Sequence, residues 1–314
     1  MAGLSIGVDV GGTKIAGGVV DGAGKIVART RRETPSTDPP AIVHNIIAVV
    51  EELRTLHEIE AVGVGSAGFV DAARSTVLFA PNLAWRDVPV RDQVAGATGL
   101  PVVVENDANA AAWGEFRYGA AEDVDDMICV TVGTGIGGGL VLAGSIYRGA
   151  HGVGAEPGHM RVVPDGHLCG CGNRGCLEQY ASGSALVREA RALASSRSVF
   201  AARLLELSGG DPGAITGPMV TGAAREGDEP SRELLADLGR WLGEGLASFA
   251  ALLDPAVFVI GGGVSEAGDL LLSPATAAFR RNLTGRGHRP EAEIRIATLG
   301  NDAGIVGAAD LARI

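Results

Sequence analysis

Three of the four cysteines lie within eight residues of one another, at Cys169, Cys171 and Cys176. In a reducing compartment such a cluster indicates metal binding rather than a disulfide. Three thiolates need one further ligand to complete a tetrahedral Zn²⁺ site, and a site closed in this way is structural. His159 and His167 are the candidates. The spacing does not choose between them, although His159 leaves room for a loop and His167 is separated from Cys169 by a single residue.

Carboxylates flank the cysteine cluster and also gather at a second place. Glu156 and Glu178 lie on either side of the cluster, and the run Glu105-Asn106-Asp107 stands where a predicted strand meets an alanine-rich helix. In α/β proteins this end of a strand is a common ligand site. Capping of the helix would account for Asp107 alone and not for the whole run. Acceptor oxygens in a rigid ring favour a polyhydroxylated substrate over an anionic one.

Two glycine-rich turns follow apolar strands and are separated by about 120 residues, too long a period for a solenoid. Backbone N–H groups in such turns can bind an anion. In the first turn Thr13 adds a hydroxyl, Lys14 a cation, and Asp9 a carboxylate able to hold hydrated Mg²⁺. The alternative is a pair of tight hairpins whose glycines only permit positive φ. Because each turn contains a threonine, we favour two phosphate-binding hairpins that face each other across a cleft.

Other nucleotide motifs fail on their context. The segments 63–68 and 133–138 match G-x-G-x-x-G, but neither opens a helix directly after its strand, as a dinucleotide fingerprint must. The segment 7–14 lacks the Gly-Lys-Ser/Thr order of a phosphate-binding P-loop.

Strands alternating with helices predict an α/β fold. We expect strands over 4–10, 15–20, 25–33, 61–66, 101–105, 127–132, 140–142, 145–147, 257–260 and 293–299, and helices over 41–56, 107–116, 178–195, 228–253 and 301–313. The repeated strand–turn–strand unit indicates a duplicated, two-lobed protein.

Composition limits the class of protein. The 314 residues are 46% hydrophobic and carry a net charge of −11, which disfavours nucleic acid and anionic membranes as partners. There is no run of about 18 apolar residues and no basic segment before Asp9, so we expect a soluble, cytoplasmic protein without a signal peptide. Cys129, in the middle of a predicted strand, is expected to be a core thiol.

Taken together, these motifs resemble those of the ROK sugar kinases (repressor, open reading frame, kinase), and most closely those of the actinobacterial ATP-dependent glucokinases. The resemblance spans nearly the whole chain. It rests on the segments Asp9–Lys14, Pro81–Asn82, Glu105–Ala110, Gly133–Gly135, Glu156–His159, Cys169–Glu178 and Gly261–Gly263. It implies a two-lobed actin/hexokinase-like (ribonuclease H-like) duplicated fold with a cleft between the lobes. The expected domains are residues 1–110 with 300–314, and residues 111–299 carrying the zinc loop.

The resemblance also implies an activity, the transfer of the ATP γ-phosphoryl group to the 6-hydroxyl of glucose, with Mg²⁺ accompanying ATP and a structural Zn²⁺. Asp107 would be the catalytic base, and His159 rather than His167 would be the fourth zinc ligand. The implied sugar contacts are Gly68, Asn82, Asn106, Asp107, Glu156, His159 and Glu178. The candidate ATP contacts are Gly7, Asp9, Gly11, Gly12, Thr13, Lys14, Gly133, Thr134, Gly135, Gly137, Gly138, Gly261, Gly262 and Gly263.

Several alternatives remain open on the sequence. The acceptor could be N-acetylglucosamine, N-acetylmannosamine or fructose, and the donor could be polyphosphate. Leu177 stands where close glucokinases often carry Trp, which bears on sugar preference. A sugar-sensing repressor is disfavoured, because a strand rather than a helix-turn-helix begins near Leu4. A homodimer or homotetramer is expected.

Overall fold

The computed structural model describes residues 3–55 and 57–314 and divides the chain into two compact units. Unit 1 comprises Met1–Cys129, Gly138–Ala155 and Ala297–Ile314, and unit 2 comprises Val130–Gly137 and Glu156–Ile296. These limits differ from the expected domains chiefly at 111–129 and 138–155, and the expected domain limits stay a prediction. Leu56, the end of one predicted helix, lies outside the described residues, as do Met1 and Ala2.

Unit 1 contains a five-stranded sheet with the order β3-β2-β1-β4-β8. Its strands are β1 (Leu4–Val10), β2 (Lys14–Val20), β3 (Ile26–Glu33), β4 (Ile59–Ser66) and β8 (Val102–Asn106). The first three form the predicted antiparallel meander, and β4 and β8 extend it in parallel beside β1. The carboxyl ends of β1, β4 and β8 therefore meet at one edge of the sheet.

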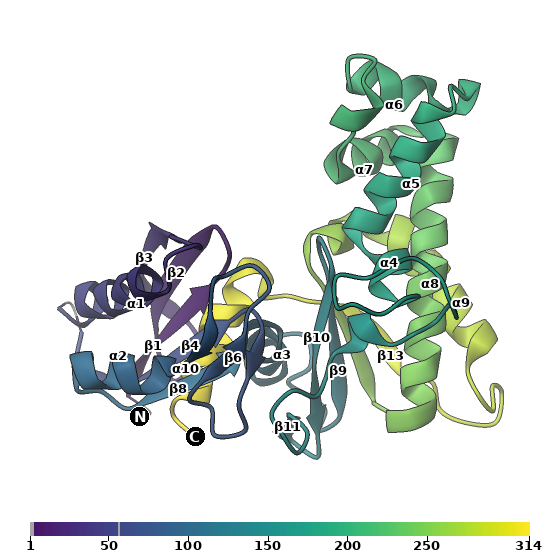
Figure 1. Ribbon diagram of the computed structural model, residues 1–314. Coiled ribbons are helices and arrows are strands. Elements are labelled where there is room, and N and C mark those ends of the chain that lie inside the picture. The colour runs from purple at the N-terminus through teal and green to yellow at the C-terminus, as the bar shows by residue number, and fades with distance from the viewer. Residues whose placement is uncertain (1–2, 56) are drawn as a thin grey trace. The chain divides into compact units, whose positions relative to one another are not determined.

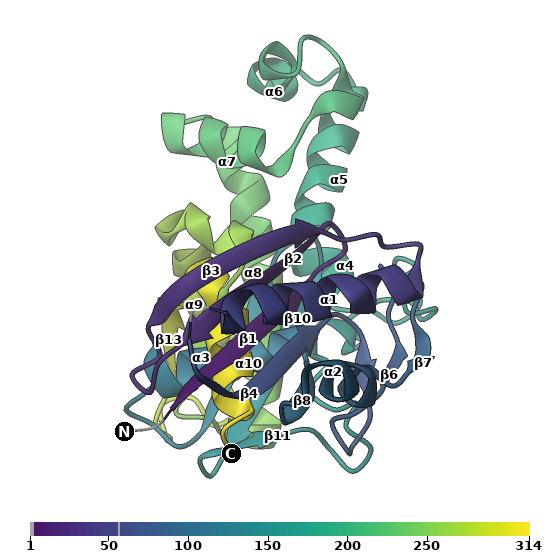
Figure 2. The same cartoon turned by 90° about the vertical axis from the view of Figure 1, so that its left-hand side faces the viewer.

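Helices cover both faces of this sheet (Figure 2). They are α1 (Pro39–Arg54) on one face and α3 (Asp107–Tyr118) and α10 (Ala303–Leu311) on the other. Two consecutive residues of β2 show the alternation: a Cβ on Gly17 would meet Val49 of α1, whereas a Cβ on Gly18 would meet Ile305 of α10. The apolar spacing of α1 puts its valines, isoleucines and Leu53 in the core beneath the sheet.

Unit 1 also holds elements that the sequence did not predict. They are α2 (Val90–Thr98) and a small sheet of β5 (Phe69–Val70), β6 (Val77–Phe79) and β7 (Arg86–Val88). Strands of two or three residues are too short to display an alternating pattern.

The second sheet has the order β11-β10-β9-β12-β13. Its strands are β9 (Met127–Val132), β10 (Ile136–Leu142), β11 (Ser145–Tyr147), β12 (Val257–Gly261) and β13 (Glu293–Ile296). As in the first sheet, an antiparallel hairpin lies at one edge, and parallel strands lie at the other. This repeated order confirms the predicted duplication. β10 begins four residues before the predicted strand, so the second glycine turn is confined to 133–135, and β13 ends at Ile296 rather than at 299.

The helices of unit 2 are α4 (Glu178–Ala181), α5 (Gly183–Ser195), α6 (Ala202–Leu207), α7 (Gly217–Glu226), α8 (Glu229–Leu253) and α9 (Asp269–Asn282). α8 packs against α4, α5, α7 and α9, and α6 packs against α5 and α7 (Figure 1). α8 confirms the predicted helix, with Asp228 accepting the N–H of Ser231 as its N-cap. The helix predicted over 178–195 is instead broken at Ser182, which caps α5 by accepting the N–H of Ala185.

Short 3₁₀ turns connect several of these elements, at Pro157–His159, Val199–Ala201, Pro212–Ala214, Gly263–Ala267 and Gly300–Asp302. The last of these turns takes the place of the first turn of the helix predicted over 301–313. Across the described residues, no helix combines the length and the apolar composition needed to cross a membrane.

Candidate active site

Asp107 begins α3 directly after β8. The helix is capped by the preceding residue, since the side chain of Asn106 accepts the N–H of Asn109 at 3.0 Å. One oxygen of Asp107 accepts the N–H of Ala108 at 2.9 Å. Asn106 therefore caps α3, a role that the sequence allowed for Asp107. The Asp107 carboxylate is not needed as the cap.

Two aspartates of unit 1, Asp9 and Asp107, have raised pKa values. Burial raises the pKa of Asp9 to about 6, and the negative charge of Asp107 adds to this increase while Lys14 opposes it. Burial also raises the pKa of Asp107, against a hydrogen bond from the N–H of Ala108. Both carboxylates are consequently better proton acceptors than exposed aspartates, and a nearby cation would stabilise their ionised forms.

The first glycine turn lies close to a candidate sugar residue. The N–H of Gly11 donates to the carbonyl of Lys14 at 3.0 Å, which closes the turn between β1 and β2. A Cβ on Gly12 would lie 3.3 Å from the Cβ of Asn82, so the exposed Asn82 stands beside this turn. Unit 1 thus brings together a candidate phosphate turn and a candidate sugar contact.

Gly68 is tied to Asn106 on the same side of unit 1. The Asn106 side-chain amide donates to the Gly68 carbonyl at 3.0 Å. Gly68 has φ +105°, and a Cβ there would lie 2.1 Å from the carbonyl oxygen of Phe79. Only glycine fits this position without a shift of backbone.

In unit 2 the predicted metal ligands form one cluster. Potential ligand atoms of His159, Cys169, Cys171 and Cys176 all lie within 4.8 Å of one another. The sulfurs of Cys171 and Cys176 are 3.7 Å apart, and Nδ1 of His159 is 3.6 Å from the sulfur of Cys169. A tetrahedral Zn²⁺ requires about 3.8 Å between two sulfurs and about 3.6 Å between sulfur and nitrogen. The donor set therefore fits zinc.

His167 has a different environment. Its ring packs on that of Tyr180 with centroids 5.3 Å apart, and its backbone N–H donates to the Tyr180 hydroxyl. Tyr180 in turn packs on Trp241 of α8. His167 thus braces the segment 159–176, here named the zinc loop.

Glu178, the first residue of α4, connects the zinc loop to the second glycine turn. Its Oε1 accepts a hydrogen bond from the Cys169 thiol at 3.3 Å, and its Oε2 accepts the N–H of Ile136 at 3.2 Å. The N-terminus of α5 holds the same turn, because the N–H of Gly183 donates to the carbonyl of Gly133 at 2.8 Å. Glu156 precedes the 3₁₀ turn that carries His159, and its carbonyl accepts the His159 N–H at 3.1 Å.

Several candidate ATP contacts lie within strands rather than in turns. Gly7 is buried in β1, where a Cβ would lie 1.9 Å from the carbonyl oxygen of Ile305, so close packing of α10 accounts for this glycine. Gly137 and the buried Gly138 belong to β10. Gly261 ends β12, whereas Gly262 (φ +84°) and Gly263 are exposed. The positions of Thr134 and Gly135 in the turn agree with the prediction, and a nucleotide role for each of these residues stays a prediction.

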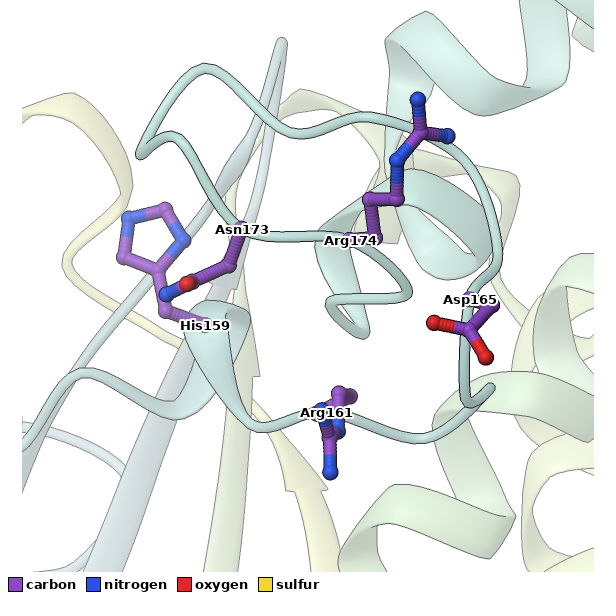
Figure 3. A pocket seen from close by; sticks show the side chains of 5 residues that line it. All are labelled: His159, Arg161, Asp165, Asn173 and Arg174. Carbon is purple, nitrogen blue, oxygen red and sulfur yellow. The ribbon is translucent and has the colours of Figure 1, made fainter.

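A cavity of about 250 Å³ lies along the zinc loop (Figure 3). It is lined by His159, Arg161, Asp165, Asn173 and Arg174. His159 and Asn173 lie together at one side, and Asp165 lies at the other. Leu177, in contrast, is fully buried and packs against Gly245 of α8. The size of the side chain at this position therefore affects core packing.

Sequence reasoning did not identify Arg74 and Arg148, which both form ion pairs with the buried Glu105. Their positions lie more than 30 residues to either side of Glu105, and no spacing in the sequence connects the three. The chemical character of Glu105 was the only available signal, because a glutamate in a buried strand needs a partner.

The duplicated α/β fold carries carboxylates and a glycine turn in unit 1 and a metal-ligand cluster beside Glu178 in unit 2. This combination defines a sugar-kinase class of protein. The sequence model that describes the ROK family matches residues 5–314 of the chain, and the chain belongs to this family. It is 52% identical to the glucokinase of Streptomyces coelicolor over 311 residues, which cover 99% of this chain and 98% of that enzyme.

Solved structures agree with this relationship. The chain is similar to a ROK family glucokinase from Streptomyces griseus in complex with glucose and AMPPNP, with 54% identity, a TM-score of 0.88 and 99% of each chain covered. It is also similar to a ROK hexokinase from Thermus thermophilus, with 36% identity, a TM-score of 0.83, and 98% and 97% of the two chains covered. The expected actin/hexokinase-like fold is therefore confirmed.

Proposed function

We propose that this protein transfers the γ-phosphoryl group of ATP to the 6-hydroxyl of glucose, the glucokinase reaction. The observation that carries the proposal is the 52% identity, over nearly the whole of both chains, to a Streptomyces glucokinase. The S. griseus relative, which binds glucose and AMPPNP, supports the same sugar and donor. A repressor function is disfavoured by the net charge of −11.

Asp107 is the proposed catalytic base. Burial raises the pKa of Asp107, which makes its carboxylate a stronger proton acceptor than an exposed aspartate. The 6-hydroxyl oxygen would attack the γ-phosphorus, its proton would pass to Asp107, and the bond to the β-phosphate oxygen would break to release ADP. Phosphoryl transfer depends mostly on positioning and charge neutralisation, and Lys14 and the 11–13 turn would hold the phosphates.

Asn82, Asn106, the Gly68 backbone, Glu156, His159 and Glu178 are the proposed sugar contacts. Oε1 of Glu178 lies 3.3 Å from the sulfur of Cys169, and a thiolate that binds zinc has no proton to donate to it. Metal binding would thus free Oε1 of Glu178 for a sugar hydroxyl.

The proposed cofactors are a structural Zn²⁺ on His159, Cys169, Cys171 and Cys176, and Mg²⁺ bound with ATP. Zinc would fix the shape of the loop that carries His159. Mg²⁺ would neutralise phosphate charge, with Asp9 as the carboxylate that holds its hydration shell. A cytoplasmic location and a homodimeric or homotetrameric state are also proposed.

The experiment is product analysis by phosphorus NMR with purified protein, Mg²⁺ and glucose, and with either ATP or polyphosphate as donor. The proposal predicts glucose 6-phosphate and ADP from ATP, and no product from polyphosphate alone. A product phosphorylated at another position, or faster transfer from polyphosphate, would contradict it. Parallel reactions with N-acetylglucosamine, N-acetylmannosamine and fructose test the alternative acceptors.

A further inference from the structure

The residue before the proposed sugar-binding pair is a buried carboxylate with two arginine partners. The side chain of Glu105 is only 1% exposed. Nε of Arg148 lies 2.8 Å from its Oε2 and 3.0 Å from its Oε1, and Nε of Arg74 lies 3.3 Å from Oε2. All three residues belong to unit 1, where Glu105 is in β8 and Arg148 follows β11.

Glu105 also holds the first turn of α3. Its Oε1 accepts the backbone N–H of Asn106 at 2.9 Å and the side-chain amide of Asn109 at 3.2 Å. These two residues are the N-cap of α3 and the residue whose N–H the cap accepts. The carboxylate therefore orients the turn from which Asp107 projects.

Arg148 connects this carboxylate to the segment after Gly68. Its terminal nitrogens donate to the carbonyls of Asp71 at 2.9 Å, Ala72 at 3.2 Å and Val70 at 3.5 Å. The guanidinium group can make such a planar fork of hydrogen bonds, and an ammonium group cannot. Asn106 therefore holds the Gly68 carbonyl, and Arg148 holds the segment that begins two residues later.

Arg74 reaches Glu105 from a backbone conformation that a side-chain-bearing residue rarely adopts, with φ +53°. Its carbonyl accepts the N–H of Val104 in β8 at 3.1 Å. Residues in this region cost free energy and persist only where the surrounding structure holds them. The ion pair with Glu105 and the hydrogen bond from Val104 together keep Arg74 in this conformation.

Stability alone is a poor explanation for the network. Removing two charges from water costs about as much as their attraction returns, and apolar replacements of buried ion pairs are often neutral or stabilising. What the ion pairs add is orientation, because each hydrogen bond fixes a direction as well as a distance.

We propose that Glu105 and Arg148 are positioning residues for the phosphoryl acceptor site: they set the geometry of Asn106, Asp107 and the Gly68 carbonyl without touching the substrate. The inference rests on the proposed sugar-kinase function and adds two residues to its machinery. A misplacement of about 1 Å costs on the order of 100-fold in rate, so a small rotation of the first turn of α3 is enough to matter.

The test compares Glu105→Gln with Glu115→Gln. Glu115 is a matched control, because it is a glutamate of α3 that is 1% exposed, as Glu105 is. Its carboxylate accepts the N–H groups of Thr298 and Leu299 near the other end of the helix. For Glu105→Gln we expect a rise in the glucose KM and a fall in kcat, about 10- to 100-fold in kcat/KM for glucose, with an ATP KM within about twofold of wild type. For Glu115→Gln we expect a lower melting temperature with both KM values unchanged.

Arg148→Lys and Arg74→Gln keep the proposal testable if Glu105→Gln does not fold. Arg148→Lys retains the charge but loses the fork to the three carbonyls, so we expect an intermediate loss in kcat/KM for glucose. Arg74 is one-quarter exposed and makes one ion pair with Glu105, so Arg74→Gln should fold and lose less kcat/KM for glucose than Arg148→Lys does. Folded Glu105→Gln or Arg148→Lys proteins with wild-type glucose kinetics would overturn the inference, as would equal kinetic losses in Glu115→Gln. A wild-type protein that phosphorylates no sugar would instead overturn the proposed function, and the inference with it.

Discussion

At the scale of single residues, the proposed phosphoryl transfer depends on the carboxylate of Asp107, which does not cap α3. Asn106 caps α3, so replacement of Asp107 by its neutral isostere should leave the helix intact. Asp107→Asn should lower kcat by about 10²- to 10⁴-fold, the usual contribution of a general base. Steady-state kinetics with circular dichroism and thermal unfolding checks both parts of this prediction.

Asp92→Asn is the control, since Asp92 also lies in the first turn of a helix, α2, but is exposed. It should leave kcat unchanged. A folded Asp107→Asn protein with a kcat near that of wild type would remove Asp107 from the mechanism.

The raised pKa of Asp9 predicts how the free energy of unfolding of the ligand-free protein depends on pH. Its folded pKa of about 6 exceeds the ordinary value of 3.8, so the folded state binds a proton more tightly than the unfolded state does. Ionised Asp9 therefore destabilises the fold, and the cost grows as pH rises from about 4 to 6 and is complete above 6. Asp9→Asn should raise the free energy of unfolding by about 1–2 kcal/mol at pH 7.5, allowing for solvent screening, and by about a third of that at pH 4.5. Urea unfolding at the two pH values measures the difference, and an Asn variant less stable than wild type at pH 7.5 would contradict it.

The residues that could be predicted from the sequence were those with unmistakable chemistry. Three cysteines within eight residues indicated a metal site, and the structure places His159 with them while His167 packs on Tyr180. The partners of Glu105 could not be predicted, because Arg74 and Arg148 reach it only after the chain has folded.

At the scale of elements, the zinc loop has little regular structure of its own. It contains two isolated antiparallel β-bridges, which pair Arg161 with Cys176 and Leu168 with Arg174. Cys171→Ser should therefore lower zinc content and melting temperature together, because metal binding contributes directly to folding in such loops. Atomic absorption and differential scanning calorimetry measure the two quantities.

Cys129 provides the control, since it is a buried thiol in β9 outside the cluster. Cys129→Ala should change stability while leaving the zinc stoichiometry intact. A Cys171→Ser protein with as much zinc as wild type would count against the proposed ligand set.

The packing of α8 against α9 yields a prediction that is independent of catalysis. A Cβ on Gly243 would lie 2.1 Å from the carbonyl oxygen of Ala275, whereas nothing lies within 4 Å of a Cβ on Gly222 in α7. Gly243→Ala should destabilise the protein by about 1–3 kcal/mol. Gly222→Ala should stabilise it by up to about 1 kcal/mol, because alanine favours helix. Chemical unfolding of both variants checks the signs, and equal effects would contradict the close contact.

Elements with a long periodic pattern were the ones that the sequence predicted well. α8 has 25 residues, an aspartate N-cap and a proline in its first turn, and its predicted limits differ from the observed ones by a single residue. The helix predicted over 178–195 missed the break at Ser182-Gly183-Ser184, because alanine and leucine resume at Ala185; Ser182 caps a new helix there. Elements as short as β5, β6 and β7 depend on tertiary contacts that no local pattern displays.

At the scale of the whole molecule, the duplication was visible in the sequence as two glycine turns, and the two sheets repeat one strand order. Their glycines, however, serve two purposes. Those of the turns are proposed to admit phosphate to the backbone, whereas Gly7 in β1 and Gly139 in β10 allow helices α10 and α3 to approach. Composition cannot separate these purposes, because both require the absence of a side chain.

The most direct test of the account is the ratio of kcat/KM values for glucose and for N-acetylmannosamine, measured with saturating Mg²⁺ and ATP on the full-length protein. The account predicts ATP-dependent turnover with at least about a 100-fold preference for glucose, the discrimination available to a site that forms hydrogen bonds with specific hydroxyls. A preference for the N-acetylated sugar, or no turnover of either sugar in a folded protein that contains zinc, would contradict it.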